Sequence, residues 1–172
     1  EVRKIKVELR MMADVGLVGM PSVGKSTILS MITNANPKIA SYHFTTLSPN
    51  LGVVKTYGKE FIIADLPGLI EGASEGVGLG FKFLKHAMRT KVIAHIIDMS
   101  GENSFSPLES YETIYNELAK YDESLIKKPS VVIASKMDLP ESKENLAKFK
   151  EKYPNLEVYP ISSVYNEGLD AL

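Results

Sequence analysis

The chain has 172 residues, 44% of them hydrophobic, and its 20 basic and 21 acidic residues give a net charge of −1. This length and composition predict one globular domain with a substantial core. The balanced charge excludes a general electrostatic attraction to nucleic acid or anionic lipid. Cysteine is absent, which excludes disulfides and thiolate sites, and no apolar run reaches the length of a membrane span. These features predict a soluble, cytoplasmic protein.

The two ends of the sequence look cut. It begins at Glu1 without an initiator methionine and stops at GLDAL, where a helical pattern is starting. We therefore expect residues 1–172 to form a single domain that belongs to a longer protein and is truncated in its last helix.

Short β-branched runs alternate with helical patterns along the chain, which predicts an α/β fold with a mostly parallel sheet and helices on both faces. Six strands are expected, at residues 13–18, 51–57, 60–66, 92–99, 130–137 and 156–162. Only Gly58 and Lys59 separate the second strand from the third, which is too short for a crossover helix. That pair should form an antiparallel hairpin.

The clearest helix is expected at residues 106–121. Ser106 and Glu109 form a capping box, with Pro107 at the first helical position. Four side chains recur at helical spacing and should face the sheet as core residues: Leu108, Tyr111, Tyr115 and Leu118.

The segment GMPSVGKST, residues 19–27, matches the phosphate-loop pattern G-x-x-x-x-G-K-[ST] between a predicted strand and a helix expected at residues 27–33. Glycines let several backbone N–H groups face one anion, and the helix N-terminus adds its positive dipole end. We expect Lys25 to reach the β- and γ-phosphates and the Ser26 hydroxyl to bind Mg²⁺. An ordinary strand-to-helix turn is disfavoured by the GKS triplet. The residues assigned to the nucleotide are Gly19, Met20, Pro21, Ser22, Val23, Gly24, Lys25, Ser26 and Thr27.

A second phosphate-binding segment, DLPG, ends the third predicted strand. The carboxylate of Asp65 can hold Mg²⁺ directly or through water. After Leu66, the Pro67 and Gly68 pair turns the chain and leaves the Gly68 amide free to bond a γ-phosphate oxygen. The glycine-rich residues 69–80 predict a segment that orders with a triphosphate and relaxes with a diphosphate. The alternative is a surface loop with a chance turn.

Base recognition is expected from SKMD, residues 135–138. GTPases use Asn-Lys-x-Asp here, because the aspartate accepts hydrogen bonds from guanine N1–H and the 2-amino group, which adenine lacks. Asp138 fills this role, and the stem of Lys136, next to Met137, can cover the base. Ser135 replaces the usual asparagine and should lose one polar bridge, which would weaken nucleotide affinity. Alone, SKMD also fits a strand-end turn, but Ser162, Ser163 and Val164 follow, where a backbone amide could bond guanine O6.

Together these segments closely resemble the Obg (CgtA) GTPases, bacterial members of the translation-factor-related class of phosphate-loop proteins. The resemblance covers nearly the whole chain and rests on KVELRMMADVGLVGMPSVGKST, YHFTTLSPNLGVV and DLPGLIEGASEGVGLGFKFLKH, with weaker support from SKMD and SSV. It implies a phosphate-loop NTPase of the Ras-like G-domain type with six strands. It also implies a first switch at Phe44, Thr45, Thr46, Leu47 and Ser48, with Thr46 as the second Mg²⁺ ligand.

The same resemblance implies a glycine-rich N-terminal domain, a role in assembly of the large ribosomal subunit and in the stress response, and ppGpp as a further candidate ligand of the nucleotide site. The partner would be the large ribosomal subunit or its precursor. This domain carries no direct nucleic-acid signal and no membrane segment.

Hydrolysis of GTP to GDP and phosphate is expected to depend on Lys25, Thr46 and Gly68 and to be slow. Leu69 stands where many GTPases have a glutamine that positions water, and leucine cannot do so. The three arginines, Arg3, Arg10 and Arg89, lie outside both switches, and Ser22 replaces the asparagine that recruits K⁺ in some relatives. His86 and His95 are expected to pack in the core, whereas His43 could help to position water.

Two functions remain open on this evidence. One is a slow GTPase switch whose GTP form binds a large partner. The other is an assembly module that senses GDP or ppGpp and for which hydrolysis is incidental. A phosphate-loop kinase is less favoured, because no site for an acceptor substrate is evident.

Overall fold

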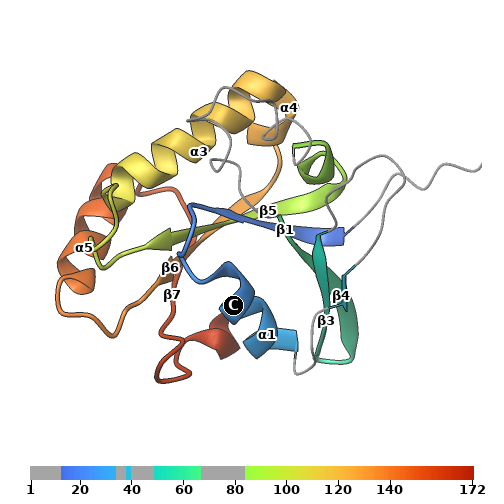
Figure 1. The fold of residues 1–172 in the computed structure, drawn as a ribbon, viewed down its shortest axis with the longest axis horizontal. Helices are drawn as coiled ribbons and strands as arrows, with labels where there is room; N and C mark the ends of the chain where they lie inside the picture. Colours follow the sequence, from blue (N-terminus) through green and yellow to red (C-terminus); the bar gives the residue numbers. More distant parts are fainter. Residues whose placement is uncertain (1–12, 34–37, 40–48, 67–83) are drawn as a thin grey trace, which may run out of the picture.

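The computed structural model describes residues 13–33, 38–39, 49–66 and 84–172 (Figure 1). The elements in chain order are β1 (Ala13–Gly19), α1 (Lys25–Thr33), β2 (Lys38–Ile39), β3 (Asn50–Thr56), β4 (Lys59–Asp65), β5 (Thr90–Asp98), α3 (Pro107–Tyr121), α4 (Glu123–Ile126), β6 (Ser130–Ser135), α5 (Ser142–Lys152), β7 (Val158–Pro160) and the 3₁₀ turn η1 (Leu169–Ala171). Residues 84–87 are also helical.

One sheet runs through the molecule in the order β2-β3-β4-β1-β5-β6-β7. β3 pairs antiparallel with β2 and β4, and the other neighbours are parallel. The predicted α/β fold with its six strands and one hairpin is therefore confirmed, and the two-residue β2 extends the sheet at one edge. Figure 1 shows α3 and α5 on one side of the sheet and α1 on the other.

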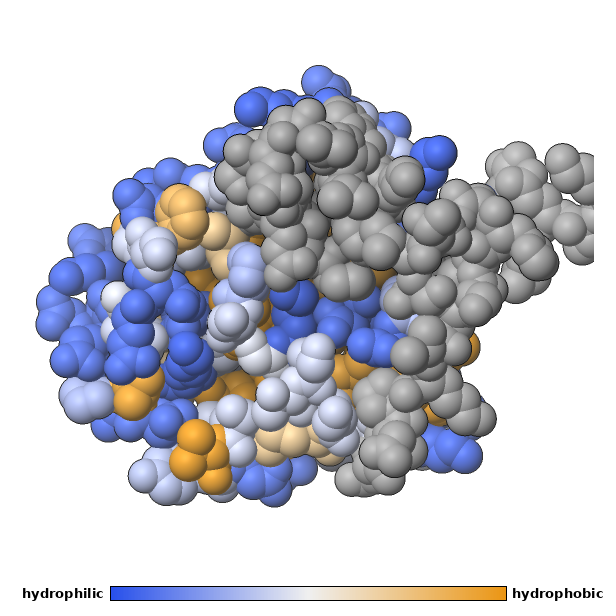
Figure 2. Space-filling model, in the orientation of Figure 1, coloured by the Kyte–Doolittle hydropathy of each residue, from blue (hydrophilic) through white to orange (hydrophobic). Residues whose placement is uncertain are grey.

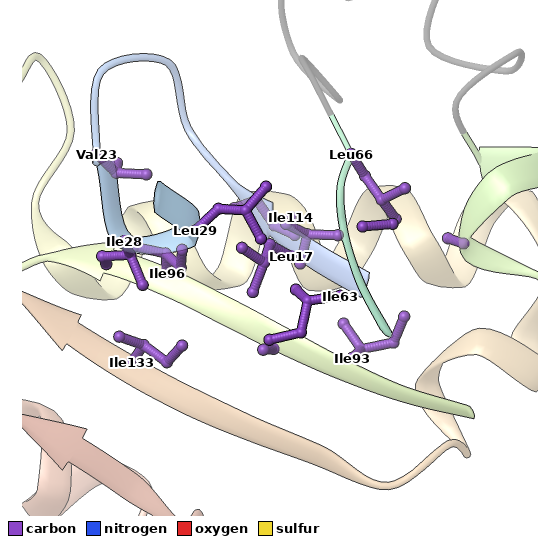
Figure 3. Packing of buried hydrophobic residues seen from close by; sticks show 14 of the residues in the cluster. Leu17, Val23, Ile28, Leu29, Ile63, Leu66, Ile93, Ile96, Ile114 and Ile133 are labelled. Atoms are coloured by element: carbon purple, nitrogen blue, oxygen red, sulfur yellow. The ribbon is translucent and has the colours of Figure 1, made fainter. Parts of the chain in front are cut away.

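β1 forms the centre of the sheet and of the core. Leu17 and Val18 are fully buried, and side chains from β4, β5, α1 and α3 surround them, including Ile63, Ile96 and Ile114 (Figure 3). Because β1, β4, β5 and β6 are parallel, their carboxyl ends meet at one edge of the sheet, where α/β proteins bind ligands.

The predicted capping box of α3 is confirmed. The Ser106 hydroxyl accepts from the Glu109 N–H at 3.3 Å, and the Glu109 carboxylate accepts from the Ser106 N–H at 2.8 Å. Tyr111 and Leu118 pack inward as predicted, and Leu108 is partly buried. This packing offsets the conformational entropy that the helix loses when it forms.

The prediction that Tyr115 faces the sheet is wrong. Its side chain is 38% exposed, and Ile114, fully buried, occupies the core instead. Spacings of three, four and seven residues all fit one helical face, so the sequence alone does not fix the rotation of the helix. Here the inward stripe passes through Ile114, and Tyr115 lies at its edge with its ring centroid 6.0 Å from that of Tyr111.

The surface around α5 is hydrophilic. The side of the molecule where α5 lies is largely blue in Figure 2, and its exposed charges include the ion pair of Lys148 with Glu144. Hydrophobic residues on this face are scattered. None of the helices in the described ranges combines the length and apolar character needed to cross a bilayer.

Candidate functional site

The phosphate loop lies between β1 and α1, at the carboxyl edge of the sheet. Met20 and Val23 are buried in the main core cluster and anchor the loop, whereas Pro21 and Ser22 are exposed. Ser22 and Gly24 have positive φ angles of 63° and 99°. Such alternation of left-handed and ordinary backbone creates an anion-binding concavity of N–H groups. The predicted strand, loop and helix context is confirmed, with α1 starting two residues before the expected position.

The side chain of Lys25 folds back onto the start of the phosphate loop. Its ammonium donates to the carbonyl oxygens of Gly19 at 3.1 Å and Met20 at 3.2 Å. The first helical hydrogen bond, from the Ile28 N–H to the Gly24 carbonyl at 2.9 Å, fixes the start of α1 beneath it. Lys25 is thus a cation held at the start of the loop, where a phosphate group can meet it.

Ser26 and Asp65 meet beside the loop, because β4 pairs with β1 and places Asp65 opposite Leu17. The Ser26 hydroxyl donates to Asp65 Oδ2 at 2.8 Å. Asp65 is only 3% exposed, and among the described residues its Oδ1 has no hydrogen-bond partner. A buried carboxylate oxygen without a partner is costly, and a hydroxyl with a carboxylate is an oxygen donor set that suits Mg²⁺. These two residues therefore fit the predicted metal site.

Leu66 follows Asp65 and takes part in the core. Its side chain is buried, and its N–H donates to the Leu17 carbonyl at 3.1 Å. Several other predicted site residues lie outside the described residues, namely Phe44, Thr45, Thr46, Leu47, Ser48, Pro67 and Gly68, together with His43 and Leu69.

The SKMD segment begins at Ser135, the last residue of β6, and lies next to the phosphate loop. The Ser135 hydroxyl is buried within hydrogen-bond distance of the Val23 carbonyl, at 2.9 Å, and of the Ile97 carbonyl, at 3.2 Å. Ser135 therefore has a polar bridge to the phosphate loop, and the expected loss of one bridge relative to asparagine stays a prediction. The serine side chain is shorter than that of asparagine, but it reaches the phosphate loop because β6 ends close to Val23.

Asp138 is oriented by Ser162. The Ser162 hydroxyl, almost fully buried, donates to Asp138 Oδ1 at 2.8 Å. The Met137 N–H donates to the Ile161 carbonyl at 3.2 Å, which ties the two segments together. The Ser162 N–H donates to the Glu167 carbonyl at 3.1 Å, whereas Ser163 is partly buried and Val164 is 71% exposed. The structure thus brings together the two segments that the sequence assigned to the base.

Sequence reasoning missed Asp98, which ends β5 at the same edge. Asp98 is 4% exposed, and its Oδ2 lies 2.6 Å from the Lys136 ammonium. The signal was available, since Asp98 closes an apolar strand as Asp65 does, but no linear motif links it to Lys136.

The histidines of the described residues pack as predicted. His86 and His95 are buried, and the His95 ring lies 5.2 Å from that of Tyr111. Burial lowers the pKa of His95 from 6.5 to about 4. This imidazole is therefore neutral at physiological pH and belongs to the core.

A phosphate loop after the first strand, a carboxylate at the end of β4 and the SKMD segment at the end of β6 define a phosphate-loop domain of the Ras-like G-domain class. The chain belongs to the family described as 50S ribosome-binding GTPase, whose model matches residues 14–136.

The resemblance to the Obg GTPases is confirmed by similar sequences. The "GTPase Obg" of Leuconostoc citreum is 52% identical, with 100% of this chain and 41% of the relative aligned. The corresponding proteins of Bacillus licheniformis and Staphylococcus aureus are 58% and 55% identical, with 97% and 98% of this chain and 40% of each relative aligned. The chain thus spans about two fifths of the length of these relatives.

Solved structures share the fold. Aquifex aeolicus Era bound to GDP and AlF4− is 27% identical, with a TM-score of 0.69 over 92% of this chain and 54% of Era. The G domain of the T. maritima iron transporter FeoB is 21% identical, with a TM-score of 0.66 over 92% of each chain.

Proposed function

We propose that this GTPase is a Mg²⁺-dependent, slowly hydrolysing switch that acts in assembly of the large ribosomal subunit and in the stress response, and hence in the cytoplasm. One observation carries the nucleotide part of the proposal: the 2.9 Å contact between Ser135 Oγ and the Val23 carbonyl. It joins the base segment to the phosphate loop, so that one nucleotide can be held at both of its ends. The family description, 50S ribosome-binding GTPase, supports the ribosomal part.

The phosphate end would be held by the loop N–H groups and by Lys25, whose ammonium already lies at the start of the loop. Ser26 and Asp65 would hold Mg²⁺, with Thr46 as a third ligand from the first switch. When bound, Mg²⁺ neutralises charge on the β- and γ-phosphate oxygens. The Gly68 amide would bind the γ-phosphate and so distinguish GTP from GDP.

The base end would be read by Asp138, whose Oδ1 is fixed by Ser162. A carboxylate held in this way accepts from guanine N1–H and the 2-amino group, and leaves adenine without a matching donor. Because the Ser162 N–H is already bonded to Glu167, the amide that meets guanine O6 would come from Ser163 or Val164.

Slow hydrolysis follows from Leu69, which cannot position water, and from the lack of an arginine in either switch segment of the sequence. The isolated chain should turn over on the order of 10⁻³ per second or slower, like other unassisted GTPases. A large partner that supplies the missing group would accelerate the step.

A single-turnover GTP assay with purified large ribosomal subunits tests this function, with small subunits as the matched control. Acceleration of at least about tenfold by large subunits alone supports the switch. If no particle changes the rate while GDP or ppGpp strengthens binding to the large subunit, the switch is overturned in favour of a sensing module.

A further inference from the structure

We propose that Asp98 is a positioning residue for guanine binding, which fixes Lys136 so that the stem of this lysine lies along the base. Asp98 ends β5 and Lys136 directly follows β6, and these strands are parallel neighbours with Asp98 opposite Ser135. Their charged groups meet at 2.6 Å between Nζ and Oδ2. The inference rests on the guanine site proposed above.

Asp98 is a rigid anchor rather than a surface ion. Its Oδ1 accepts from the Ser100 N–H at 2.9 Å and from the Ser100 hydroxyl at 2.6 Å, and its Oδ2 also accepts from Asn103 Nδ2 at 2.5 Å. Both oxygens are therefore bonded, and the side chain is almost fully buried. A buried carboxylate with such a complete set of donors keeps one orientation.

The segment after Asp98 is itself tied to the base segment. The Met99 N–H donates to the Ser135 carbonyl at 3.1 Å, and the Met99 carbonyl accepts from Asn145 Nδ2 of α5 at 2.8 Å. The residue that anchors Lys136 thus belongs to the same hydrogen-bonded unit as the lysine.

Lys136 is fixed at both ends. Its backbone has a φ of 59°, in the left-handed region, and its carbonyl accepts from the Ser142 hydroxyl at 2.7 Å. Its ammonium is held by Asp98, and 31% of the side chain remains exposed. A lysine stem fixed at both ends loses little rotamer freedom when a base stacks on it, whereas a free lysine would lose much of it. Asp98 should therefore raise guanine affinity without touching the nucleotide.

Titration of a fluorescent GDP analogue tests the inference with Asp98→Asn, Lys136→Met and the double variant. Asp98→Asn should raise the Kd about tenfold, Lys136→Met should have a similar effect, and the double variant should be no worse than Lys136→Met, because both changes remove one coupled interaction. The control is Asp14→Asn, which breaks the 2.8 Å ion pair with Lys91 at the opposite end of the sheet. It should keep the Kd within about twofold.

A Kd for Asp98→Asn within twofold of the parent overturns the inference, as do losses that multiply in the double variant. If circular dichroism shows that Asp98→Asn is unfolded, Asn103→Ala takes its place in the same cycle, with an expected loss of about threefold that disappears beside Lys136→Met. Asp138→Asn separates the two hypotheses. Retained GDP affinity in that variant defeats the guanine site itself, whereas its loss, with Asp98→Asn unaffected, defeats only the role of Asp98.

Discussion

Ser135 and Val23 are 112 positions apart in sequence, and the Ser135 hydroxyl lies 2.9 Å from the Val23 carbonyl. We predict that Ser135→Ala removes this contact, weakens the free energy of GDP binding by about 1 kcal/mol and speeds GDP release about fivefold. Stopped-flow release of a fluorescent GDP analogue measures the effect. The control is Thr113→Ala, which also removes a hydroxyl bonded to a carbonyl, at 2.7 Å on α3. An unchanged release rate for Ser135→Ala would show that the contact does not act on the nucleotide.

Asp138→Asn should change the base preference. The variant places an amide donor where the 2-amino group of guanine also donates, so GDP affinity should fall by about 3 kcal/mol. Xanthine carries a carbonyl at that position, and XDP binding should rise. Titration with labelled GDP, XDP and ADP gives the comparison. If the variant keeps normal GDP affinity and gains no XDP binding, SKMD is a turn at the end of a strand and does not recognise the base.

Asp65→Asn should remove the response to Mg²⁺ and leave the nucleotide-free fold intact. The carboxamide oxygen of the variant can still accept from Ser26, and the position of Oδ1, which has no partner among the described residues, loses its charge. The free energy of unfolding without nucleotide should stay the same or rise. GDP affinity should change less than about twofold between excess Mg²⁺ and EDTA, because a carboxamide is a weaker ligand. A variant that keeps the response of the parent chain would place the metal elsewhere.

Gly168→Ala should destabilise the fold and the base site together. Gly168 has a φ of 83°, and an added Cβ would lie 2.1 Å from the Pro160 carbonyl oxygen. We expect a loss of about 3 kcal/mol in urea unfolding and weaker GDP binding, since Pro160 leads into Ser162. Gly58 is the matched control, with a φ of 72° and open space around the added Cβ, and Gly58→Ala should cost only about 1 kcal/mol. If the two variants lose the same free energy of unfolding, the contact between the added Cβ at Gly168 and the Pro160 carbonyl oxygen does not destabilise the fold.

His95 should make stability depend on pH. Its pKa is about 4 in the folded state and 6.5 ordinarily, so the unfolded state binds the proton more readily between these values. The stability that neutral His95 contributes is complete above about pH 6.5 and is lost as pH falls toward 4. At pH 5 the free energy of unfolding should already be lower by about 2 kcal/mol. Urea unfolding at pH 5 and pH 7.5 measures it. His95→Phe should remove this part of the pH slope, and an unchanged slope would assign the titration to another group.

Features that depend on neighbouring residues were predictable from the sequence. Continuous apolar runs marked the six strands, Gly58 marked the hairpin, and Ser106 with Glu109 marked the start of α3. The phosphate loop was predictable because one linear segment supplies its glycines, its lysine and its hydroxyl. In each case, the interacting groups lie within a few residues of one another.

Features that depend on register between distant strands were not predictable. β2 is only Lys38 and Ile39, and it is defined by pairing with Leu51 and Asn50 rather than by a pattern of its own. The roles of Ser135 and Asp98 arise because β5 and β6 end side by side, which fixes the contacts to Val23 and Lys136. No spacing in the sequence encodes those distances.

The central place of β1 has a consequence for how the chain acquires its activity during synthesis. Leu17 pairs with Asp65 and Ala94, so the phosphate loop is synthesised before the two strands that flank it, β4 and β5. Pairings of such high contact order form late in folding. Asp138 and Ser162 come later still, so a nascent chain can bind the whole nucleotide only after both of these residues have been made. GDP at a hundredfold its Kd then raises the free energy of unfolding by about 2.7 kcal/mol, so nucleotide binding stabilises the newly made domain.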